Sequence, residues 1–506
     1  MATWLSSRLD RLSIGTEAEV RDSVNRQIDW SVPRRCLLLG VAGSGMQALS
    51  AILHQSGHVL YGSDQICGTG REVGTDTDVR ALLKNVRLVP WGNSSPELSV
   101  DVVICSPAIP ATAPLLRWSQ DQSIRVMSLQ TAVGSVFADR RQICVAGTHG
   151  KSTTSGLLAW ILNNEASDAG VFLGAHWCAC RQSRFGRQGG HYGRSDLAVI
   201  EACEFDRSFL QLQPHHVILN GIDSDHFDCF ASDEAENAAY RQFLERVPSH
   251  GTVFFNAECQ RSASVVAKSG VASVCWKLGK REATDWAGRI VRSVAGRMTV
   301  RIWHRARRFG DLQVPVFGRH NAANLLAAVA MASYLGISAT ECQRAVADFP
   351  GLTRRLEYRG EYRGTQMMDD YAHHPAAVTT TLLSVRQAFP DRRIRVIFEP
   401  HQMNRLFRRR KQFIEALSLA DEVMVLPVFP AREQVSVADC HRISRELAAM
   451  ICELGTPAVF ADGVQTAVSL VNFTGDPEDI LLTMGAGTVY RIHDEVHRRF
   501  QRDSAA

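Results

Sequence analysis

The chain has 506 residues, of which 45% are hydrophobic and 21% are charged, with 37 Gly and 17 Pro. At roughly 100–200 residues per domain this length predicts about three or four domains, and the composition excludes a disordered, collagen-like or coiled-coil protein. The net charge is only +4, from 56 Lys and Arg against 52 Asp and Glu, so we expect no nucleic-acid partner.

The sequence lacks the features of a membrane-anchored or exported protein. It contains no run of about 18 apolar residues, and the N-terminus, which begins Met1-Ala2-Thr3-Trp4-Leu5, has no apolar signal segment. The 13 Cys are scattered, several of them in apolar runs such as those around Cys36 and Cys144, which is typical of buried thiols in a reducing compartment. We therefore expect a cytoplasmic protein with no membrane partner.

Short apolar runs alternate with helical patterns from residue 35 onward, which predicts α/β domains with parallel sheets. In the first region we predict strands at 37–39, 58–61 and 102–105 and a helix at 44–55. In the second we predict strands at 142–146, 197–200, 216–219 and 253–255 and helices at 321–334, at 339–349 and from residue 151. In the third we predict strands at 366–368, 394–398, 422–426 and 480–483 and a helix at 407–419 that carries a solvated basic run, 408–411.

The strongest chemical motif is the segment Ala146-Gly147-Thr148-His149-Gly150-Lys151-Ser152-Thr153, which follows an apolar strand and opens a helix. A glycine loop in that position lets backbone N–H groups surround phosphates at the positive end of a helix. The lysine supplies a charge to the β- and γ-phosphates, and the serine hydroxyl can bind Mg²⁺. Because Val145 stands where the full motif has a glycine, we interpret the segment as a shortened phosphate loop.

A second glycine motif, Gly40-Val41-Ala42-Gly43-Ser44-Gly45-Met46, follows the first strand, and Asp64 ends the next one. The arrangement imitates a dinucleotide-binding fingerprint, but the spacing is G-x-x-G-x-G. It therefore indicates a site for a nucleotide pyrophosphate in general more than for NAD. Tight packing of the strand against the helix is the alternative explanation.

Acidic residues and a histidine follow two strands of the second region. One cluster, 201–206, begins with Glu201, and the other, 220–228, contains His226. Because ligands bind at the carboxyl ends of strands in open α/β sheets, both clusters point to the edge that carries the phosphate loop. Mg²⁺ prefers carboxylate oxygens together with substrate phosphates, so these residues are candidate metal ligands. Solvated strand ends are the alternative.

Polar groups also follow the strands of the third region. They lie in the segments 369–375, which reads Asp-Asp-Tyr-Ala-His-His-Pro, 398–405, which reads Phe-Glu-Pro-His-Gln-Met-Asn-Arg, and 485–488, which reads Gly-Ala-Gly-Thr. Each segment alone is a weak signal. Together they predict a domain whose strand ends could close over the phosphates.

In this order the motifs resemble the Mur ligase family of peptidoglycan synthesis, and within it the branch that adds L-alanine. Further markers are Ser106 to Ile109, Ser208-Phe209, Gly318 to Asn321 with Asn324, and Arg354-Arg355. The resemblance covers nearly the whole chain from about residue 35. It implies an N-terminal extension (1–32), a Rossmann-like UDP-sugar-binding domain (33–140), a central P-loop ATPase domain (141–350) and a C-terminal Rossmann-like α/β domain that binds the amino acid (351–506).

The activity that the resemblance implies is an ATP- and Mg²⁺-dependent ligation. ATP would phosphorylate the lactyl carboxylate of UDP-N-acetylmuramate, and the amine of L-alanine would then displace phosphate from the acyl phosphate. The protein would serve cell-wall synthesis, and hence cell shape and division, as a monomer or a homodimer.

The resemblance also implies roles for individual residues. The UDP-sugar site would comprise Gly43, Ser44, Gly45, Met46, Asp64 and Ser106. The ATP site would comprise Gly147, Thr148, His149, Gly150, Lys151, Ser152, Thr153, Asn321, Arg355 and Asp370. Mg²⁺ would be bound by Ser152, Glu201 and His226, and the amino acid by His373, His401 and Arg405. Lys151, His226, Arg355 and His373 would act in catalysis, the last in handling a proton of the amine.

The chain departs from the family pattern at four positions of these motifs. Cys203 and Phe205 replace an Asp and a Ser, and Glu399 and Gln402 replace a Gln and an Arg. Other branches use a carbamylated lysine shortly after the histidine. No Lys lies between His226 and Lys268, which fits the L-alanine-adding branch.

Three alternatives to that branch stay open. The first is the ligase that recycles a whole tripeptide onto the same UDP-sugar, which shares the 369–375 segment. The second is a nicotinamide-dependent oxidoreductase, based on residues 40–64, although it leaves the phosphate loop unexplained. The third is an inactive nucleotide-binding regulator, suggested by Cys203 and Gln402 but opposed by the presence of Lys151, Glu201 and His226.

Overall fold

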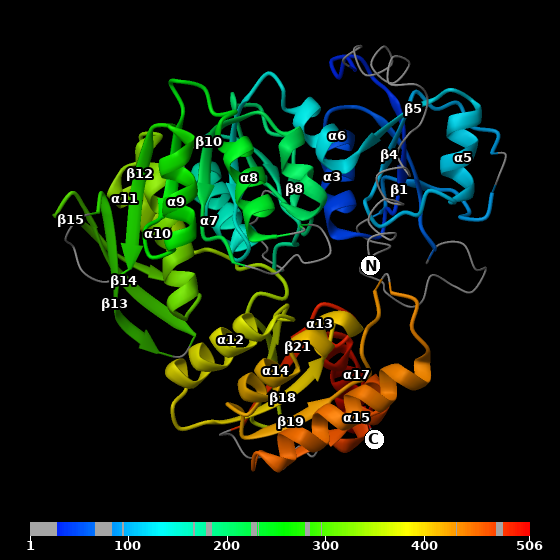
Figure 1. The fold of residues 1–506 in the computed structure, drawn as a ribbon, viewed down its shortest axis with the longest axis vertical. Helices are drawn as coiled ribbons and strands as arrows, with labels where there is room; N and C mark the ends of the chain where they lie inside the picture. The colour runs from blue at the N-terminus through cyan, green and yellow to red at the C-terminus, as the bar shows by residue number, and fades with distance from the viewer. Residues whose placement is uncertain are drawn as a thin grey trace.

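The computed structural model describes residues 28–65, 83–93, 96–164, 167–178, 185–223, 230, 232–278, 284–294, 296–431, 433–471 and 479–505, without the side chains of 500–505. This part of the chain forms three α/β units, each built on one sheet. The predicted fold class is therefore confirmed. The first two lie side by side and the third lies below them (Figure 1). The extension predicted at 1–32 lies almost wholly outside the described residues.

The N-terminal sheet has five strands in the order β3-β2-β1-β4-β5, and every pairing is parallel. Its strands are β1 (Arg35–Leu39), β2 (Val59–Ser63), β3 (Arg87–Leu88), β4 (Val102–Cys105) and β5 (Arg125–Ser128), and its helices are α3 (Ser44–Gln55), α5 (Pro114–Asp121) and α6 (Leu129–Val136). The last four residues of β1 are buried, as expected for a strand covered on both faces. The predicted helix at 44–55 is confirmed.

The central sheet has ten strands in the order β15-β14-β13-β12-β11-β10-β6-β9-β7-β8. The strands are β6 (Arg141–Ala146), β7 (Gly170–Phe172), β8 (Gly190–His191), β9 (Leu197–Glu201), β10 (Pro214–Leu219), β11 (Thr252–Asn256), β12 (Ser273–Leu278), β13 (Trp286–Val294), β14 (Arg297–His304) and β15 (Arg307–Val314). The helices are α7 (Lys151–Asn164), α8 (Asp233–Leu244), α9 (Gln260–Ser269), α10 (Arg319–Tyr334) and α11 (Ala339–Ala347). No strand was expected between residues 256 and 320, so β12 to β15 extend this sheet beyond the prediction.

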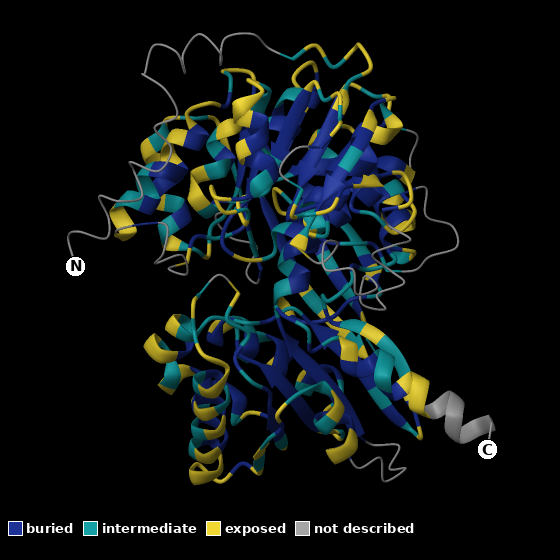
Figure 2. Cartoon of the chain, turned by 90° about the vertical axis from the view of Figure 1, so that its right-hand side faces the viewer, coloured by how far each residue is buried: buried dark blue, intermediate teal, exposed yellow. Residues whose placement is uncertain are grey.

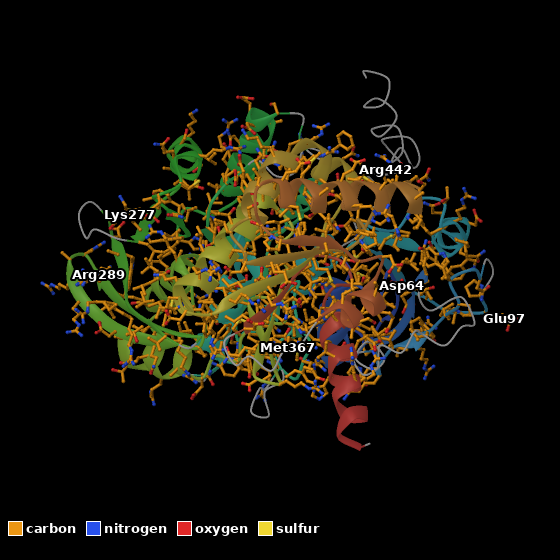
Figure 3. The ribbon with its side chains drawn as sticks, turned by 90° about the horizontal axis from the view of Figure 1, so that it is seen from below. Asp64, Glu97, Lys277, Arg289, Met367 and Arg442 are labelled. Atoms are coloured by element: carbon orange, nitrogen blue, oxygen red, sulfur yellow. The ribbon has the colours of Figure 1, made fainter. Side chains whose placement is uncertain are left out.

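Among the antiparallel strands β13 to β15, β14 follows a pattern of period two. In β14 the buried Met298, Val300 and Ile302 alternate with Thr299 and Arg301, which is the pattern of a sheet with one face on the core. The seven arginines of residues 285–314 hide this alternation in the sequence. Seen from below, Arg289 of β13 and Asp64 of the N-terminal domain lie toward opposite sides of the molecule (Figure 3).

The C-terminal sheet has six strands in the order β16-β17-β21-β18-β19-β20, of which only β16 is antiparallel to its neighbour. The strands are β16 (Glu357–Tyr362), β17 (Thr365–Asp370), β18 (Arg393–Glu399), β19 (Glu422–Val425), β20 (Ala458–Phe460) and β21 (Asp479–Gly485). The helices are α12 (Pro375–Ala388), α13 (Met403–Arg408), α14 (Arg410–Leu417), α15 (Val437–Glu453), α16 (Val464–Leu470) and α17 (Arg491–Ala505). Figure 2 shows these strands buried behind helices whose outer faces are exposed.

The single helix predicted at 407–419 is wrong. The chain forms α13 and α14 instead, which meet at Arg409 with φ −120° and ψ 22°. The basic run is also not uniformly solvated, because Arg410 packs 4.9 Å from the centre of the Phe407 ring and pairs with Glu446 at 3.7 Å.

The N-terminal domain packs closely on the edge of the central sheet. A Cβ atom on Gly190 of β8 would fall almost on the carbonyl group of Ala48 in α3. The hydroxyl of Ser44, at the start of the same helix, donates to the carbonyl oxygen of Gly174 at 2.7 Å. The absence of a side chain at Gly190 therefore lets α3 pack directly on β8.

We predict that Gly190→Ala separates these two domains and lowers the free energy of unfolding by about 1–3 kcal/mol, the usual cost of overpacking. The melting temperature should fall by several degrees. Gly92→Ala is the matched control, since a Cβ there would meet nothing within 4 Å. Equal melting temperatures for the two variants would contradict the packing of α3 on β8.

Candidate active site

The phosphate-loop segment connects β6 to α7 and has no room for side chains at its glycines. Gly147 and Gly150 have φ of +122° and +77°, values that favour glycine. A Cβ on Gly147 would lie 2.8 Å from the carbonyl oxygen of Gly221, and one on Gly150 would collide with the side-chain amide of Asn324. The loop is thus pressed between the end of β10 and the start of α10.

The Lys151 side chain turns back into its own loop. Its Nζ lies 2.6 Å from the carbonyl oxygen of Gly147, 3.1 Å from that of Thr148 and 2.8 Å from Glu204 Oε2. The Glu204 side chain is fully buried, and that of Lys151 is only 13% exposed. Burial by itself lowers the pKa of Lys151, but the neighbouring acid Glu204 raises it above the ordinary value, so the ammonium group keeps its charge.

Ser152, Glu201 and Arg355 meet beside this lysine. Ser152 Oγ donates to Glu201 Oε1 at 2.9 Å, and the backbone N–H of Gly174 donates to Glu201 Oε2 at 2.7 Å. Arg355, which comes from the C-terminal domain, donates from Nη2 to Ser152 Oγ at 3.1 Å. A hydroxyl, a carboxylate and a guanidinium from two domains therefore converge on one point.

Buried amides fix the neighbouring helix start. Asn324 Nδ2 donates to Asn321 Oδ1 at 3.2 Å, and Asn321 Nδ2 donates to the carbonyl oxygen of Phe317 at 2.9 Å. Asn220, at the end of β10, donates to the carbonyl oxygen of His149 at 3.2 Å and to Thr154 Oγ1 at 3.0 Å. Thr154 Oγ1 in turn donates to Asn324 Oδ1 at 3.2 Å, so the loop, β10 and α10 are joined by buried side chains.

The thiol of Cys203 lies near Glu204 and Lys151. Burial, together with the nearby Glu204, raises its pKa to about 11. The thiol is therefore protonated near neutral pH, and a thiolate nucleophile is not supported here.

The C-terminal domain faces the loop with the ends of β17 and β18. Asp370 accepts hydrogen bonds from the N–H groups of Leu356 and Ala372 at 2.8 and 2.9 Å, so its carboxylate orders its own domain. The ring of His373 lies 5.4 Å from that of His401. Arg405 Nη1 lies 3.2 Å from His401 Nδ1.

The first glycine motif, Asp64 and Ser106 lie at the carboxyl ends of β1, β2 and β4, respectively. Asp64 Oδ2 accepts from the Ala42 N–H at 3.1 Å, and a Cβ on Gly40 would lie 2.9 Å from Ser106 Cβ. Met46 differs from the other predicted sugar-site residues because its side chain is buried in the core. If Met46 has a role at the site, it is through its backbone or through packing.

One cavity of about 1080 Å³ joins the three domains. Of the predicted site residues it is lined by Ser44, Thr148, His149, Gly150, Lys151, Ser152, Thr153, Glu201, Asn321, Arg355, Asp370 and His373. Within the described residues, its wall does not include Gly43, Gly45, Met46, Asp64, Ser106, Gly147, His401 or Arg405. His226 lies outside the described residues.

Several residues that shape the cavity had no individual role predicted from the sequence. Glu204 stood in the acidic cluster but was not recognised as the partner of Lys151. Asn220 carried no signal beyond its place after a strand. Arg354 and Asp369 belong to the motifs Arg354-Arg355 and 369–375, and each is the neighbour of a residue that was assigned a role. Their positions at strand ends and loop junctions were the one signal that could have identified them.

The donors present suit a hard cation. No group of three or more His, Cys, Asp or Glu side chains in the described ranges forms a metal cluster by itself. However, Ser152 and Glu201 place a hydroxyl and a carboxylate 2.9 Å apart beside the phosphate loop, and Mg²⁺ commonly takes few protein ligands together with substrate phosphates. The residues therefore fit Mg²⁺ bound with a nucleotide.

Comparison with known proteins agrees with this geometry. Residues 145–332 match the Mur ligase middle domain, and residues 354–487 match the Mur ligase, glutamate ligase domain. The chain is 32% identical to the UDP-N-acetylmuramate–L-alanine ligase of Acidothermus cellulolyticus over 468 residues, which covers 90% of this chain and 92% of that protein. It is 30% identical to the enzyme of that name from Rubrobacter xylanophilus over 466 residues, covering 91% and 99%.

Two solved structures share the fold. The UDP-N-acetylmuramate–alanine ligase of Thermotoga maritima superposes with a TM-score of 0.77 at 22% identity and covers 93% of this chain and all of that one. A murein peptide ligase from Psychrobacter arcticus gives a TM-score of 0.68 at 23% identity, covering 92% and 98%. On its matched domains and its relatives over nearly its full length, the chain belongs to the Mur ligase family.

Proposed function

We propose that this protein joins the lactyl carboxylate of UDP-N-acetylmuramate to the amine of L-alanine with the energy of ATP, in peptidoglycan precursor synthesis. The observation that carries the proposal is the single cavity in which a phosphate loop, an acid-hydroxyl pair and an arginine from a second domain meet. The names of its relatives supply the substrates. Without those names, the fold and the cavity still support an ATP-dependent ligation.

We assign one substrate to each domain. The sheets span residues 35–128, 141–314 and 357–485, which suits domains of 33–140 for the UDP-sugar, 141–350 for ATP and 351–506 for the amino acid. No helix in the described ranges is long and apolar enough to cross a membrane. We infer a cytoplasmic enzyme, which acts as a monomer or a homodimer.

A carboxylate must be activated before an amine can replace its oxygen, because O⁻ is a poor leaving group. We infer that a carboxylate oxygen attacks the γ-phosphorus of ATP, that ADP leaves, and that an acyl phosphate forms. The amine nitrogen then attacks the acyl carbon and inorganic phosphate leaves. Because phosphoryl transfer depends mainly on positioning and on charge, the protein has to hold cations around the transferring group.

The chain supplies those cations from two sides. Lys151 stands inside the loop on the ATPase side, and Arg355 reaches Ser152 from the C-terminal domain. Ser152, Glu201 and His226 would hold Mg²⁺, which neutralises phosphate charge when it is bound. Asn321 and Asp370 line the same cavity, near where we place the nucleoside. Contact between the two domains also restricts water, which would hydrolyse the acyl phosphate.

The amine would arrive from the C-terminal side. His373 lines the cavity and its Nδ1 lies 2.9 Å from the carbonyl oxygen of Tyr371. That bond favours a proton on Nδ1 and leaves Nε2 as the acceptor for the proton of the amine. The ring of His401 lies beside that of His373, and Arg405 lies beside His401. We place the carboxylate of the amino acid near these two residues.

The test is direct product analysis. Purified protein with ATP, Mg²⁺, UDP-N-acetylmuramate and L-alanine should release ADP and form a UDP-N-acetylmuramoyl-L-alanine of the expected mass. Parallel reactions with glycine, L-serine or the tripeptide of the recycling ligases define specificity. Product from the tripeptide alone would select that alternative, and ADP release without any amide would contradict both ligases.

We predict that Lys151→Met lowers kcat by about 10²–10³-fold, as expected for the loss of roughly 3–4 kcal/mol of transition-state stabilisation. It should also destabilise the protein, because Glu204 is left buried without a counter-charge. The double variant Lys151→Met/Glu204→Gln removes the pair together, so it should recover much of the melting temperature and stay inactive. Activity in the double variant close to that of the parent would remove Lys151 from catalysis.

We predict that Glu201→Gln raises the Mg²⁺ concentration needed for half-maximal rate by about tenfold or more, because a hard cation loses a charged oxygen. Glu245→Gln, at the exposed C-terminal end of α8, is the matched control. The measurement is the initial rate against free Mg²⁺ at saturating ATP. A Glu201→Gln curve that overlays the parent curve would show that Glu201 is not a ligand.

We predict that Arg405→Ala raises the KM for L-alanine about tenfold or more and leaves the KM for ATP unchanged, since a charged hydrogen bond contributes about 1.5–3 kcal/mol. Gln402→Arg should lower the same KM by adding a second guanidinium. Arg408→Ala, at the exposed end of α13, is the control. If Arg405→Ala and Arg408→Ala behave alike, Arg405 belongs to the surface.

A further inference from the structure

The turn that carries Arg355 has an unusual backbone. The two residues that flank Arg355, Arg354 and Leu356, have φ of +60° and +50°. Residues other than glycine adopt this left-handed region at a cost, and they persist there where surrounding contacts impose it. The contacts that impose this turn therefore decide where the guanidinium of Arg355 lies.

Three backbone hydrogen bonds tie the turn to the C-terminal domain. The N–H of Arg354 donates to Glu357 Oε2 at 2.9 Å, and the N–H of Leu356 donates to Asp370 Oδ2 at 2.8 Å. The N–H of Tyr371 donates to the carbonyl oxygen of Arg354 at 2.7 Å. The ring of Tyr371 in turn lies 5.0 Å from the guanidinium of Arg355.

The side chain of Arg354 anchors the same turn. Its guanidinium donates to the carbonyl oxygens of Gly485 and Gly487, at 2.5 and 3.1 Å, and to Asp369 Oδ2 at 3.3 Å. It also lies 4.8 Å from the centre of the Tyr490 ring. Arg354 thus connects the linker between two domains to the loop that follows β21.

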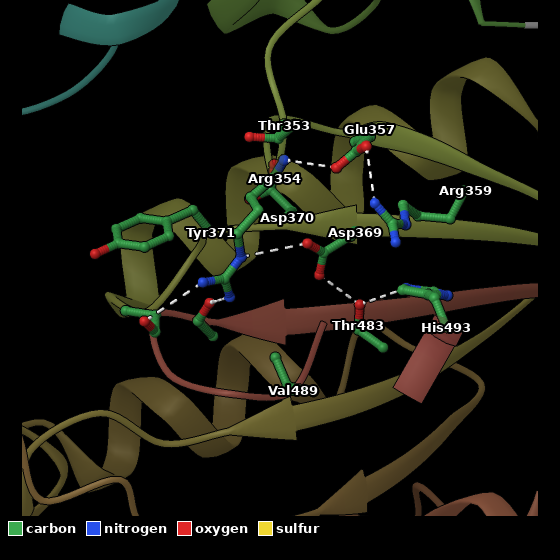
Figure 4. A network of polar contacts seen from close by, with 12 residues as sticks. Thr353, Arg354, Glu357, Arg359, Asp369, Asp370, Tyr371, Thr483, Val489 and His493 are labelled. Carbon is green, nitrogen blue, oxygen red and sulfur yellow. Dashed lines mark hydrogen bonds and ion pairs between the residues drawn. The ribbon is translucent and has the colours of Figure 1, made fainter. Parts of the chain in front are cut away.

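Asp369 is bonded to Thr483, which in turn contacts His493 (Figure 4). Thr483 Oγ1 donates to Asp369 Oδ1 at 2.5 Å, and His493 Nε2 lies 2.7 Å from the same Oγ1. Asp369, Thr483 and His493 are all buried. Burial lowers the pKa of His493 to about 3, so its imidazole is neutral. Because the one hydroxyl proton of Thr483 is used in the bond to Asp369, the contact with His493 requires the imidazole proton on Nε2.

We propose that the chain of contacts His493–Thr483–Asp369–Arg354 is a positioning device that holds the strained turn and so aims Arg355 at the transferring phosphoryl group. None of its four members is among the residues to which we assign a direct role. The inference rests on the proposed function, because it concerns the residue that we place at the γ-phosphate of ATP. The ionised carboxylate of Asp369 is the part of the device that can be titrated.

The groups around Asp369 set its sensitivity to pH. Burial raises its pKa to about 6, Arg354 and Thr483 lower it, and the acids Glu357 and Asp370 raise it. His493 of α17 stands behind Thr483, and Arg359 of β16 lies beyond Glu357, with which it pairs at 3.0 Å. Removal of the Thr483 hydroxyl takes away a bond to the charged form, so the pKa of Asp369 must rise.

The test compares Thr483→Val, which keeps the shape and loses the hydroxyl, with Thr483→Ser, which keeps the hydroxyl. We expect Thr483→Val to lower kcat about tenfold at pH 7, with the KM for L-alanine unchanged. The acidic limb of its kcat profile should move to higher pH by about one unit, because Asp369 now becomes protonated and releases Arg354 nearer neutrality. Thr483→Ser should restore the rate and the limb.

His493→Leu provides a second route to the same result, since it leaves the Thr483 hydroxyl without its donor. Melting temperature and circular dichroism at pH 8 establish that each variant is folded. A Thr483→Val enzyme with the pH profile of the parent, or a loss that Thr483→Ser shares equally, would overturn the proposal.

A binding measurement separates this inference from the proposed function. We expect the parent to bind a non-hydrolysable ATP analogue more tightly than ADP, because Arg355 faces the γ-phosphate. Thr483→Val should lose most of that preference and Thr483→Ser should keep it. If the parent makes no amide but shows this pattern, the proposed function fails and the positioning device stands. If the parent is active and the preference is equal in all three proteins, the device fails alone.

Discussion

The main physical constraint on this protein is the charged ammonium group of Lys151, which is almost completely excluded from water. The Nζ of Lys151 touches two carbonyl oxygens of its own loop and the buried carboxylate of Glu204. Such a pair is expensive to remove from water and is strongly destabilising when one partner is lost. It follows that the loop, which carries Lys151, and the segment after β9, which carries Glu204, are held together in the folded protein.

The rest of the site follows from the direction of the strands. In each of the three sheets the polar residues stand at carboxyl ends, where parallel strands leave backbone and side chains open to a ligand. Glu201 ends β9, Asn220 follows β10 and Asp370 ends β17. Close packing of the domains then turns three separate edges into one cavity, with Arg355 reaching Ser152 across the boundary.

Much of this arrangement could be predicted from the sequence because local chemistry dictates it. The loop from Gly147 to Lys151 needs glycines where a Cβ would strike Gly221 and Asn324, and such positions leave a clear signature. Residues that act through partners distant in the chain leave no such signature in the sequence. The pairing of Lys151 with Glu204 and the contact of Arg354 with Gly487 join residues 53 and 133 positions apart, and only the fold brings them together.

The misjudged elements have equally physical causes. The strands β13 to β15 were missed because only β14 alternates buried and less buried residues, and the many arginines of this region are typical of a polar connection. The break between α13 and α14 at Arg409 contains neither glycine nor proline, so the basic run reads as one continuous helix. Gln402, with φ +67° before α13, has a backbone geometry that the identity of its side chain does not reveal.

In the proposed reaction the γ-phosphoryl group of ATP passes to the carboxylate of the sugar. Positional isotope transfer tests it most directly, with UDP-N-acetylmuramate carrying ¹⁸O in both oxygens of its lactyl carboxylate. For each amide formed with L-alanine, we expect one ¹⁸O to appear in inorganic phosphate and the other to stay in the amide carbonyl. Amide formation with unlabelled phosphate, or with release of AMP and pyrophosphate, would contradict it.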